Sequence, residues 1–203
     1  MNILTANIQR EWLARILAGT KPIEYRDATD YWMNRLSRAG PPPFHLRLIN
    51  GMKPDSPEAT ILVERVDVDL LSGSIRLHLG PIVSTLRWDP TWQALYPPIP
   101  TDPPVDPASL DATSMKPPKV TLKASPELVH QLQTPGSHQF TLPLNHTMCR
   151  RLNRQGPEPF LISISGDGAS ATVIVHALFW EPFVGEGRFS VVSQHLSGPS
   201  AGA

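Results

Sequence analysis

The stretch RLSRAGPPPF at residues 35–44 recurs as RLNRQGPEPF at residues 151–160, with seven of ten positions identical. Downstream, ATILV at residues 59–63 recurs as ATVIV at residues 171–175. The second pair of blocks has an offset four residues smaller than the first, so one shortened loop accounts for the difference. Two single residues recur at the second offset, Gly73 as Gly185 and Arg76 as Arg188. A repeat of this length predicts duplicated domains rather than a solenoid, whose repeats are much shorter.

The repeat divides the 203 residues into two domains of ordinary size. We assign residues 1–96 to the first domain, 97–118 to a linker, 119–196 to a diverged second copy and 197–203 to a disordered tail. Eight of the 22 linker residues are prolines, which favour the extended polyproline II conformation. We therefore expect the linker to bridge the two copies or to lie along a domain surface.

Hydrophobic periodicity and turn residues predict the same order of elements in both copies. In the first copy we expect helices and strands at residues 8–17, 23–26, 29–39, 44–49, 60–70 and 74–79. In the second copy we expect them at residues 127–132, 139–142, 147–153, 160–165, 171–179 and 188–192. Two early helices and several later strands in each copy predict a small mixed barrel or an α+β unit.

The first copy carries a charged segment that the second copy lacks. On an extended strand alternate side chains share a face, so Glu24 and Arg26 point one way while Ile23 and Tyr25 point the other way. Glu24 and Arg26 can then pair, and Lys21 stands at the entry to the strand. Cations suit a phosphate or a base carbonyl, and a carboxylate suits an exocyclic amine. An ordinary surface ion pair is the alternative, with little effect on stability.

The motif Gly-x-Lys-x-x-Glu-x-Arg, formed by Gly19, Lys21, Glu24 and Arg26, resembles the signature of the ASCH domain family within the PUA-like superfamily. The resemblance covers about residues 3–95 and extends to the second copy only through the internal repeat. It implies two PUA-like small β-barrel domains with flanking helices, in tandem, and a cleft lined by the motif in the first domain.

The resemblance also implies the function, which is recognition of RNA, a nucleotide or a modified base through Lys21, Glu24 and Arg26. Some family members are hydrolases, so a metal-independent ribonuclease or N4-acylcytidine amidohydrolase with Lys21 and Glu24 as catalytic residues is an alternative. Members that deacylate N4-acetylcytidine have a threonine three residues after the lysine, where this chain has Glu24. A protein-interaction scaffold is the third alternative.

Other residues are candidates for nucleic-acid contacts. Arginines stand at the end of the second helix in both copies, and Trp88 follows the last strand of the first copy; the candidates are Arg35, Arg38, Arg151, Arg154 and Trp88. The arginines suit either a phosphate-binding strip or the C-terminal end of a helix dipole. Trp88 suits either base stacking or packing.

We expect three aromatic residues of the first copy to lie in the core. Trp12 and Trp32 fall at the apolar positions of the two predicted helices, and Tyr25 lies on the strand face opposite Glu24.

Composition excludes several classes of protein. The 18 basic and 18 acidic residues balance, so contact with nucleic acid has to come from a local patch. Cys149 is the only cysteine, which excludes an intrachain disulfide and suits a small buried apolar residue. The seven histidines show no metal-ligand spacing, so we expect neither a metal nor a cofactor. Without a secretory signal or membrane span, we expect a cytoplasmic protein that does not contact membranes; its oligomeric state stays open.

Overall fold

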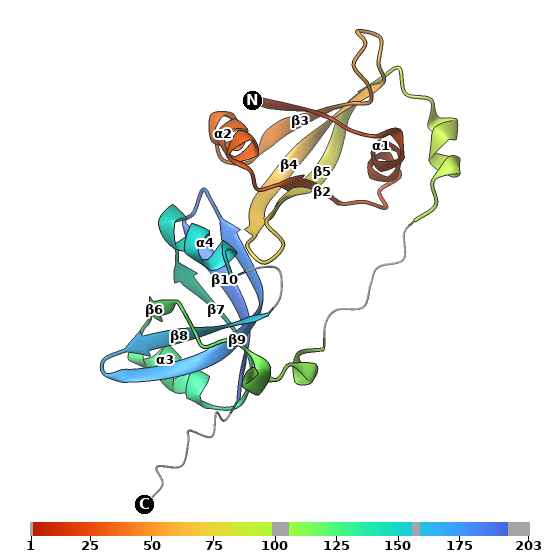
Figure 1. Ribbon diagram of the computed structural model, residues 1–203. Helices are drawn as coiled ribbons and strands as arrows, with labels where there is room; N and C mark the ends of the chain where they lie inside the picture. The colour runs from red at the N-terminus through yellow and green to blue at the C-terminus, as the bar shows by residue number, and fades with distance from the viewer. Residues whose placement is uncertain (1, 99–105, 156–158, 195–203) are drawn as a thin grey trace, which may run out of the picture. The chain divides into compact units, whose positions relative to one another are not determined.

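The computed structural model describes residues 2–98, 106–155 and 159–194. It divides into two compact units. The first unit comprises Met1–Val68 and Ser74–Asp102, and the second comprises Asp69–Gly73 and Pro103–Ala203. Figure 1 shows that both units combine a sheet with short helices.

The first unit is a five-stranded sheet with two α-helices. In chain order its elements are β1 (Ile3–Asn7), α1 (Arg10–Leu17), β2 (Ile23–Asp27), α2 (Asp30–Ala39), β3 (Phe44–Ile49), β4 (Glu58–Asp69), β5 (Ser74–Leu86) and the 3-10 helix η1 (Pro90–Leu95). The strands lie in the order β1-β3-β4-β5-β2. β1 is parallel to β3, β3 is antiparallel to β4, and β5 is antiparallel to β2.

The second unit has the same order of strands and α-helices. After the 3-10 helices η2 (Pro107–Ser109) and η3 (Ala112–Ser114), its elements are β6 (Thr121–Lys123), α3 (Pro126–Gln133), β7 (Gly136–Pro143), α4 (His146–Asn153), β8 (Phe160–Gly166), β9 (Ala169–Glu181) and β10 (Glu186–Ser193). The strands lie in the order β6-β8-β9-β10-β7, and β6 is parallel to β8 as β1 is to β3.

The α+β class predicted from the sequence is confirmed, with ten strands and four α-helices in the described residues. Among the described residues the sheet does not close into a barrel in either unit. The edge strands β1 and β2 of the first unit pair with β3 and β5 alone, and the edge strands β6 and β7 of the second unit pair with β8 and β10 alone. The short strands β1 and β6 were not predicted from the sequence. Each forms by pairing along one edge with a strand that is distant in the sequence. The loop that differs in length connects β3 to β4 in the first unit and β8 to β9 in the second.

Local sequence explains the elements that hold the first unit's polar residues. The Thr29 side chain accepts a hydrogen bond from the Trp32 backbone N–H and caps α2. Gly40, with a φ of 78°, follows the last residue of this helix and terminates it. Phe44, Leu46 and Leu48 alternate with half-buried residues along β3 and fill the core.

Part of the interval assigned to a linker packs onto the second unit. Leu110 and Met115 contact a cluster of buried residues, which are Ala112, Leu161, Ile174 and Val192. Residues 99–105 of the assigned linker and the tail at 197–203 lie outside the described residues. Among the helices that the structure describes, none has the length and apolar character required to cross a membrane.

Candidate functional site: a charged cluster on β2

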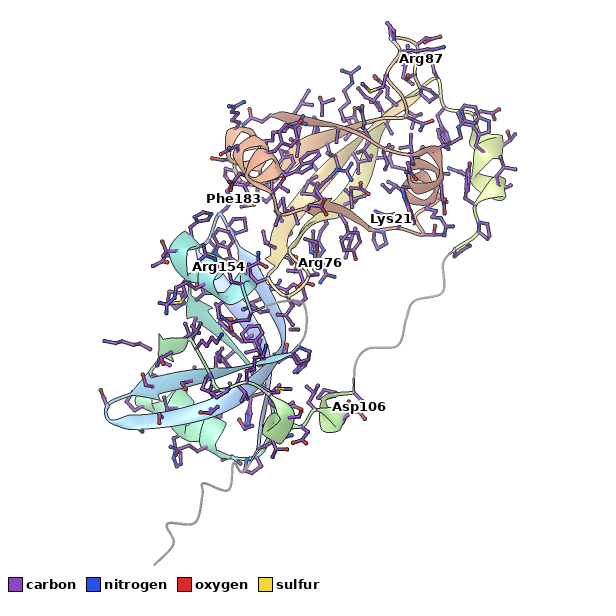
Figure 2. All side chains as sticks on the ribbon, viewed as in Figure 1. Lys21, Arg76, Arg87, Asp106, Arg154 and Phe183 are labelled. Carbon is purple, nitrogen blue, oxygen red and sulfur yellow. The ribbon has the colours of Figure 1, made fainter. Side chains whose placement is uncertain are left out.

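A left-handed glycine brings Lys21 to the edge of the sheet. Gly19 follows α1 with a φ of 73°, a conformation that glycine adopts without steric cost. Its N–H donates to the Ile16 carbonyl at 3.0 Å, and the Thr20 N–H donates to the Arg15 carbonyl at 2.9 Å. This pair of bonds is a Schellman motif, which ends the helix and turns the chain sharply. Lys21 therefore lies between α1 and the start of β2 (Figure 2).

Glu24 is buried between two cations. Its side chain is 4% exposed, and its Oε2 accepts a hydrogen bond of 2.5 Å from Lys21 Nζ. Its Oε1 accepts a hydrogen bond from Arg26. The Lys21 and Arg26 side chains are 17% and 16% exposed, so water reaches both of them. The structure thus brings together the three residues of the predicted motif, with two cations around one carboxylate.

Backbone carbonyls hold the two cations in place. Lys21 Nζ also donates to the Ile23 carbonyl at 2.6 Å, and Arg26 donates to the carbonyls of Tyr25 at 2.7 Å and Asn7 at 3.0 Å. Asn7 belongs to β1, an edge strand whose outer carbonyls would otherwise lack a partner within the sheet. Arg26 therefore links the ends of two strands that do not pair with each other.

Arg35 extends the cluster along the same edge. It donates to the Thr5 carbonyl of β1 and, at 2.8 Å, to the Tyr31 hydroxyl. Its guanidinium lies 4.9 Å from the centre of the Trp32 ring, and that of Arg26 lies 5.2 Å from the same ring. Arg35, expected at a helix end facing phosphate or the helix dipole, instead ties α2 to β1 and shares an aromatic ring with Arg26.

Aromatic rings surround the cations. Lys21 Nζ lies 5.3 Å from the Tyr25 ring centre and 5.9 Å from that of Trp12, distances within the range of cation–π contacts. Tyr25 is 47% exposed, so the prediction that it lies in the core is wrong. Trp12 and Trp32 are half-buried, and neither belongs to the buried core. Alternation along β2 correctly separated Tyr25 from Glu24, but the buried face is the one that carries Glu24.

The electrostatics of the cluster leave hydrogen-bonding capacity for a ligand. Burial lowers the pKa of the Lys21 ammonium, and contact with Glu24 only partly opposes this effect. Lysine has three N–H donors and arginine has five. In the described part of the chain, one N–H of Lys21 and two of Arg26 have no acceptor. The cluster therefore combines unused donors, a net positive charge and exposed aromatic surface.

The other predicted contact residues lie apart from these interactions. Trp88 packs edge-to-face on Trp92, with ring centres 5.0 Å apart, and Arg10 lies 4.4 Å from the Trp92 ring centre. Because the Trp88 ring contacts Trp92, the structure favours packing over base stacking for Trp88. The three remaining arginines are exposed: Arg38 and Arg151 lie on the second helix of their units, and Arg154 directly follows α4.

Sequence reasoning missed a second polar cluster, on β4 and β5. The buried Asp67 accepts a hydrogen bond at 3.0 Å from His78 and lies 3.3 Å from Arg65. Arg76 lies 3.9 Å from Asp67 and 5.9 Å from the Tyr25 ring centre. Burial lowers the pKa of His78, against the opposing effect of Asp67. Alternating polar residues at 65 and 67 and at 76 and 78, on consecutive strands, were the signal available in the sequence.

Within residues 2–98, 106–155 and 159–194, no group of three or more His, Cys, Asp or Glu side chains is placed to hold a metal ion. No protein-family model, curated protein or solved structure matches this chain.

Proposed function

We propose that the first unit is an ASCH-type domain that binds RNA, a nucleotide or a modified base through Lys21, Glu24 and Arg26. We further propose that the second unit is a diverged copy of this domain that has lost the charged cluster. The proposal rests on one observation, the buried carboxylate of Glu24 between two partly exposed cations.

The chemistry of the cluster suits a planar ligand that carries oxygen atoms. Desolvating three charges is costly, and apolar residues would stabilise a fold at least as well. The cluster therefore needs a role beyond stability. The remaining N–H groups of Lys21 and Arg26 match a phosphate or a base carbonyl, while Tyr25 and Trp12 provide faces on which a base can stack.

Binding is tested with a panel of ribonucleotides, modified nucleosides and short RNA oligomers, at two salt concentrations. We expect Lys21→Met to weaken binding of the preferred ligand by about tenfold, the effect of one charge-assisted hydrogen bond. Lys123→Met, at an exposed lysine of β6, is the matched control and should leave affinity unchanged. Equal affinity of the wild type and Lys21→Met for every bound ligand would overturn the proposal.

The pKa of Lys21 supplies a second measurement. Because burial lowers this pKa from its ordinary value of 10.5, the ammonium loses its proton at a lower pH than an exposed lysine does. Affinity should therefore fall as pH rises, beginning below pH 10.5, and Lys21→Arg should remove this dependence because arginine stays charged.

The contact between Glu24 and a lysine of lowered pKa also favours a second candidate, a metal-independent hydrolase. The substrates to assay are N4-acylated cytidine and RNA, each without added metal. Turnover that disappears in Glu24→Gln would identify the enzyme. If folded Glu24→Gln and Lys21→Met variants match the wild type in every assay, both candidates fail and the scaffold alternative stands.

A further inference from the structure

A fixed segment forms one wall of a hollow in the second unit. Gln194 holds this segment at two points: its Nε2 donates to the Leu110 carbonyl at 2.5 Å, and its Oε1 accepts from the Ala112 N–H at 3.1 Å. Leu110 and Met115 also pack against the buried cluster around Leu161. The segment that contains η3 is thereby attached to the sheet at Leu110, Ala112 and Met115, despite its proline-rich surroundings.

The hollow lies between this segment, β8 and the end of α4, and has a volume of about 580 Å³. Small-molecule sites usually fall within the range of about 300–1,000 Å³. Its apolar lining includes Phe160, Leu161 and Met115, and its polar lining includes Gln155 and the hydroxyls of Ser109 and Ser114.

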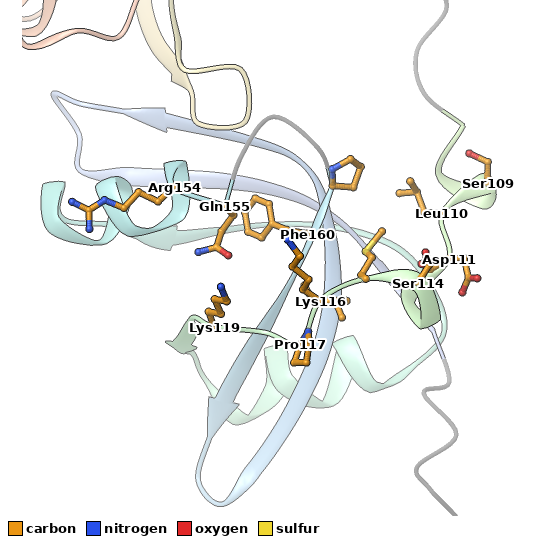
Figure 3. Close-up of a pocket in the computed structure, with 13 residues that line it drawn as sticks. Ser109, Leu110, Asp111, Ser114, Lys116, Pro117, Lys119, Arg154, Gln155 and Phe160 are labelled. Carbon is orange, nitrogen blue, oxygen red and sulfur yellow. Dashed lines mark hydrogen bonds between the residues drawn. The ribbon is translucent and has the colours of Figure 1, made fainter.

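Cations outnumber carboxylates along the hollow. Its lining includes three cations, Lys116, Lys119 and Arg154, and one carboxylate, Asp111. Figure 3 shows Asp111 at the end opposite Arg154, with the lysines between them. Asp111 accepts hydrogen bonds from Thr113, and none of the three cations has an acidic partner among the described residues. A chain without net charge thus presents a concave basic surface, which concentrates the electrostatic field on an anion.

We propose that this hollow is a second binding site, for a small organic polyanion that carries phosphate groups. Lysine and arginine donate charge-assisted hydrogen bonds to phosphate oxygens. Gln155 donates one amide N–H to the Arg151 carbonyl at 3.2 Å, and its second amide N–H is a further donor in the lining. Phe160 and Met115 offer an apolar surface to the body of the ligand. The bounded volume suits a nucleotide-sized molecule better than an extended strand of RNA.

The proposal is tested on the full chain by calorimetric titration with pyrophosphate, ATP and adenosine. We expect pyrophosphate and ATP to bind with an affinity that falls as salt rises, and adenosine to bind at least about tenfold more weakly than ATP because it has no phosphate. Lys119→Ala combined with Arg154→Ala should weaken ATP and pyrophosphate binding by about tenfold or more. Lys123→Ala, at an exposed lysine of β6 outside the lining, is the matched control and should have no effect.

The hollow belongs to the second unit, so Lys21→Met separates its ligand from any bound by the first unit. The expected binding persists in Lys21→Met and is lost in the double variant. Binding lost in Lys21→Met and retained in the double variant would assign the phosphate to the first unit and overturn this inference. Failure to bind ATP and pyrophosphate at millimolar concentration, or binding confined to RNA oligomers, would also overturn it. Unchanged thermal unfolding of the double variant, whose altered side chains are exposed, verifies that it folds.

Discussion

β2 of the first unit and β7 of the second hold the same place in their sheets but carry opposite chemistry. Glu24 lies opposite Leu77 across the β2–β5 pair, and Phe140 lies opposite Phe189 across the β7–β10 pair. Leu77 and Phe189 follow Arg76 and Arg188, which correspond in the internal repeat. A buried carboxylate in one unit therefore stands where the other has a phenylalanine, whose ring stacks on Phe189 at 5.0 Å.

The replacement extends to the whole cluster. By the strand register and the offset that relates Arg35 to Arg151, the corresponding pairs are Lys21 and Ser137, Tyr25 and Thr141, Arg26 and Leu142, Trp12 and Leu128, and Trp32 and Met148. Both cations and all three aromatic rings are absent from the second unit at these positions. The common topology thus forms with or without the charged cluster, which separates what the fold requires from what the first unit adds.

The largest expected effect comes from breaking the cluster at its centre. Glu24→Ala leaves Lys21 and Arg26 partly buried without their carboxylate, and should lower the free energy of unfolding by about 3 kcal/mol. Chemical denaturation followed by tryptophan fluorescence measures it, because four of the five tryptophans lie in the first unit.

The control for this variant replaces the three charged residues of the first unit with the corresponding residues of the second unit. A chain with Lys21→Ser, Glu24→Phe and Arg26→Leu should regain stability to within about 2 kcal/mol of the wild type, since apolar residues can replace a buried ion cluster. The same chain should not bind the first unit's ligand. A loss below about 1 kcal/mol in Glu24→Ala would mean that the cluster acts as a surface ion pair.

The stacked pair in the second unit should contribute less. Phe140→Ala removes a half-buried ring and its contact with Phe189, and should cost about 2 kcal/mol, less than a fully buried phenylalanine does. Amide hydrogen exchange along β10 measures the loss. Phe140→Leu keeps an apolar side chain and should cost about half as much; equal protection in the wild type and Phe140→Ala would contradict a packing role.

A smaller effect on stability is expected at the end of the first helix of each unit, α1 and α3, because the two helices end differently. Gly19→Ala places a side chain at a φ of 73° and should cost about 1 kcal/mol through backbone strain alone, because no atom lies within 4 Å of the added Cβ. Gly19→Asn should cost less, since asparagine tolerates this conformation. In the second unit α3 ends at Thr134 with a φ of −80°, so Thr134→Ala should change the melting temperature little.

The last comparison concerns reactivity rather than stability. Burial raises the pKa of Cys149 to about 12 from 9.0, so at pH 8 the native thiolate fraction is roughly a thousandfold below that of the unfolded chain. Titration with a coloured disulfide reagent should show rapid reaction only in denaturant. Rapid modification of the native protein would contradict burial of this helix face.

Periodicity in the sequence was sufficient to locate most elements. The predicted strand at 44–49 has the observed bounds, and α2 at Asp30–Ala39 lies within one residue of the helix predicted at 29–39. The cluster of Lys21, Glu24 and Arg26 could also be predicted from the sequence, because strand alternation and helix termination are local properties. Trp12 and Trp32 were assigned to the core because an apolar residue on a helix face suggests burial, although an aromatic ring also packs favourably against a guanidinium.

The sequence by itself determined the twofold repeat, the order of helices and strands, and which side chains of β2 share a face. Only the tertiary structure decided which face is buried. Glu24 is enclosed because Lys21 and Arg26 neutralise it, and Arg26 in turn satisfies a carbonyl of β1, a strand far away in the sequence. The basic hollow also required the tertiary structure, because the segment at 109–119 meets β8 and the residues that follow α4 only after the chain has folded. Local patterns encode backbone conformation and alternation, whereas burial depends on partners that are brought together by folding.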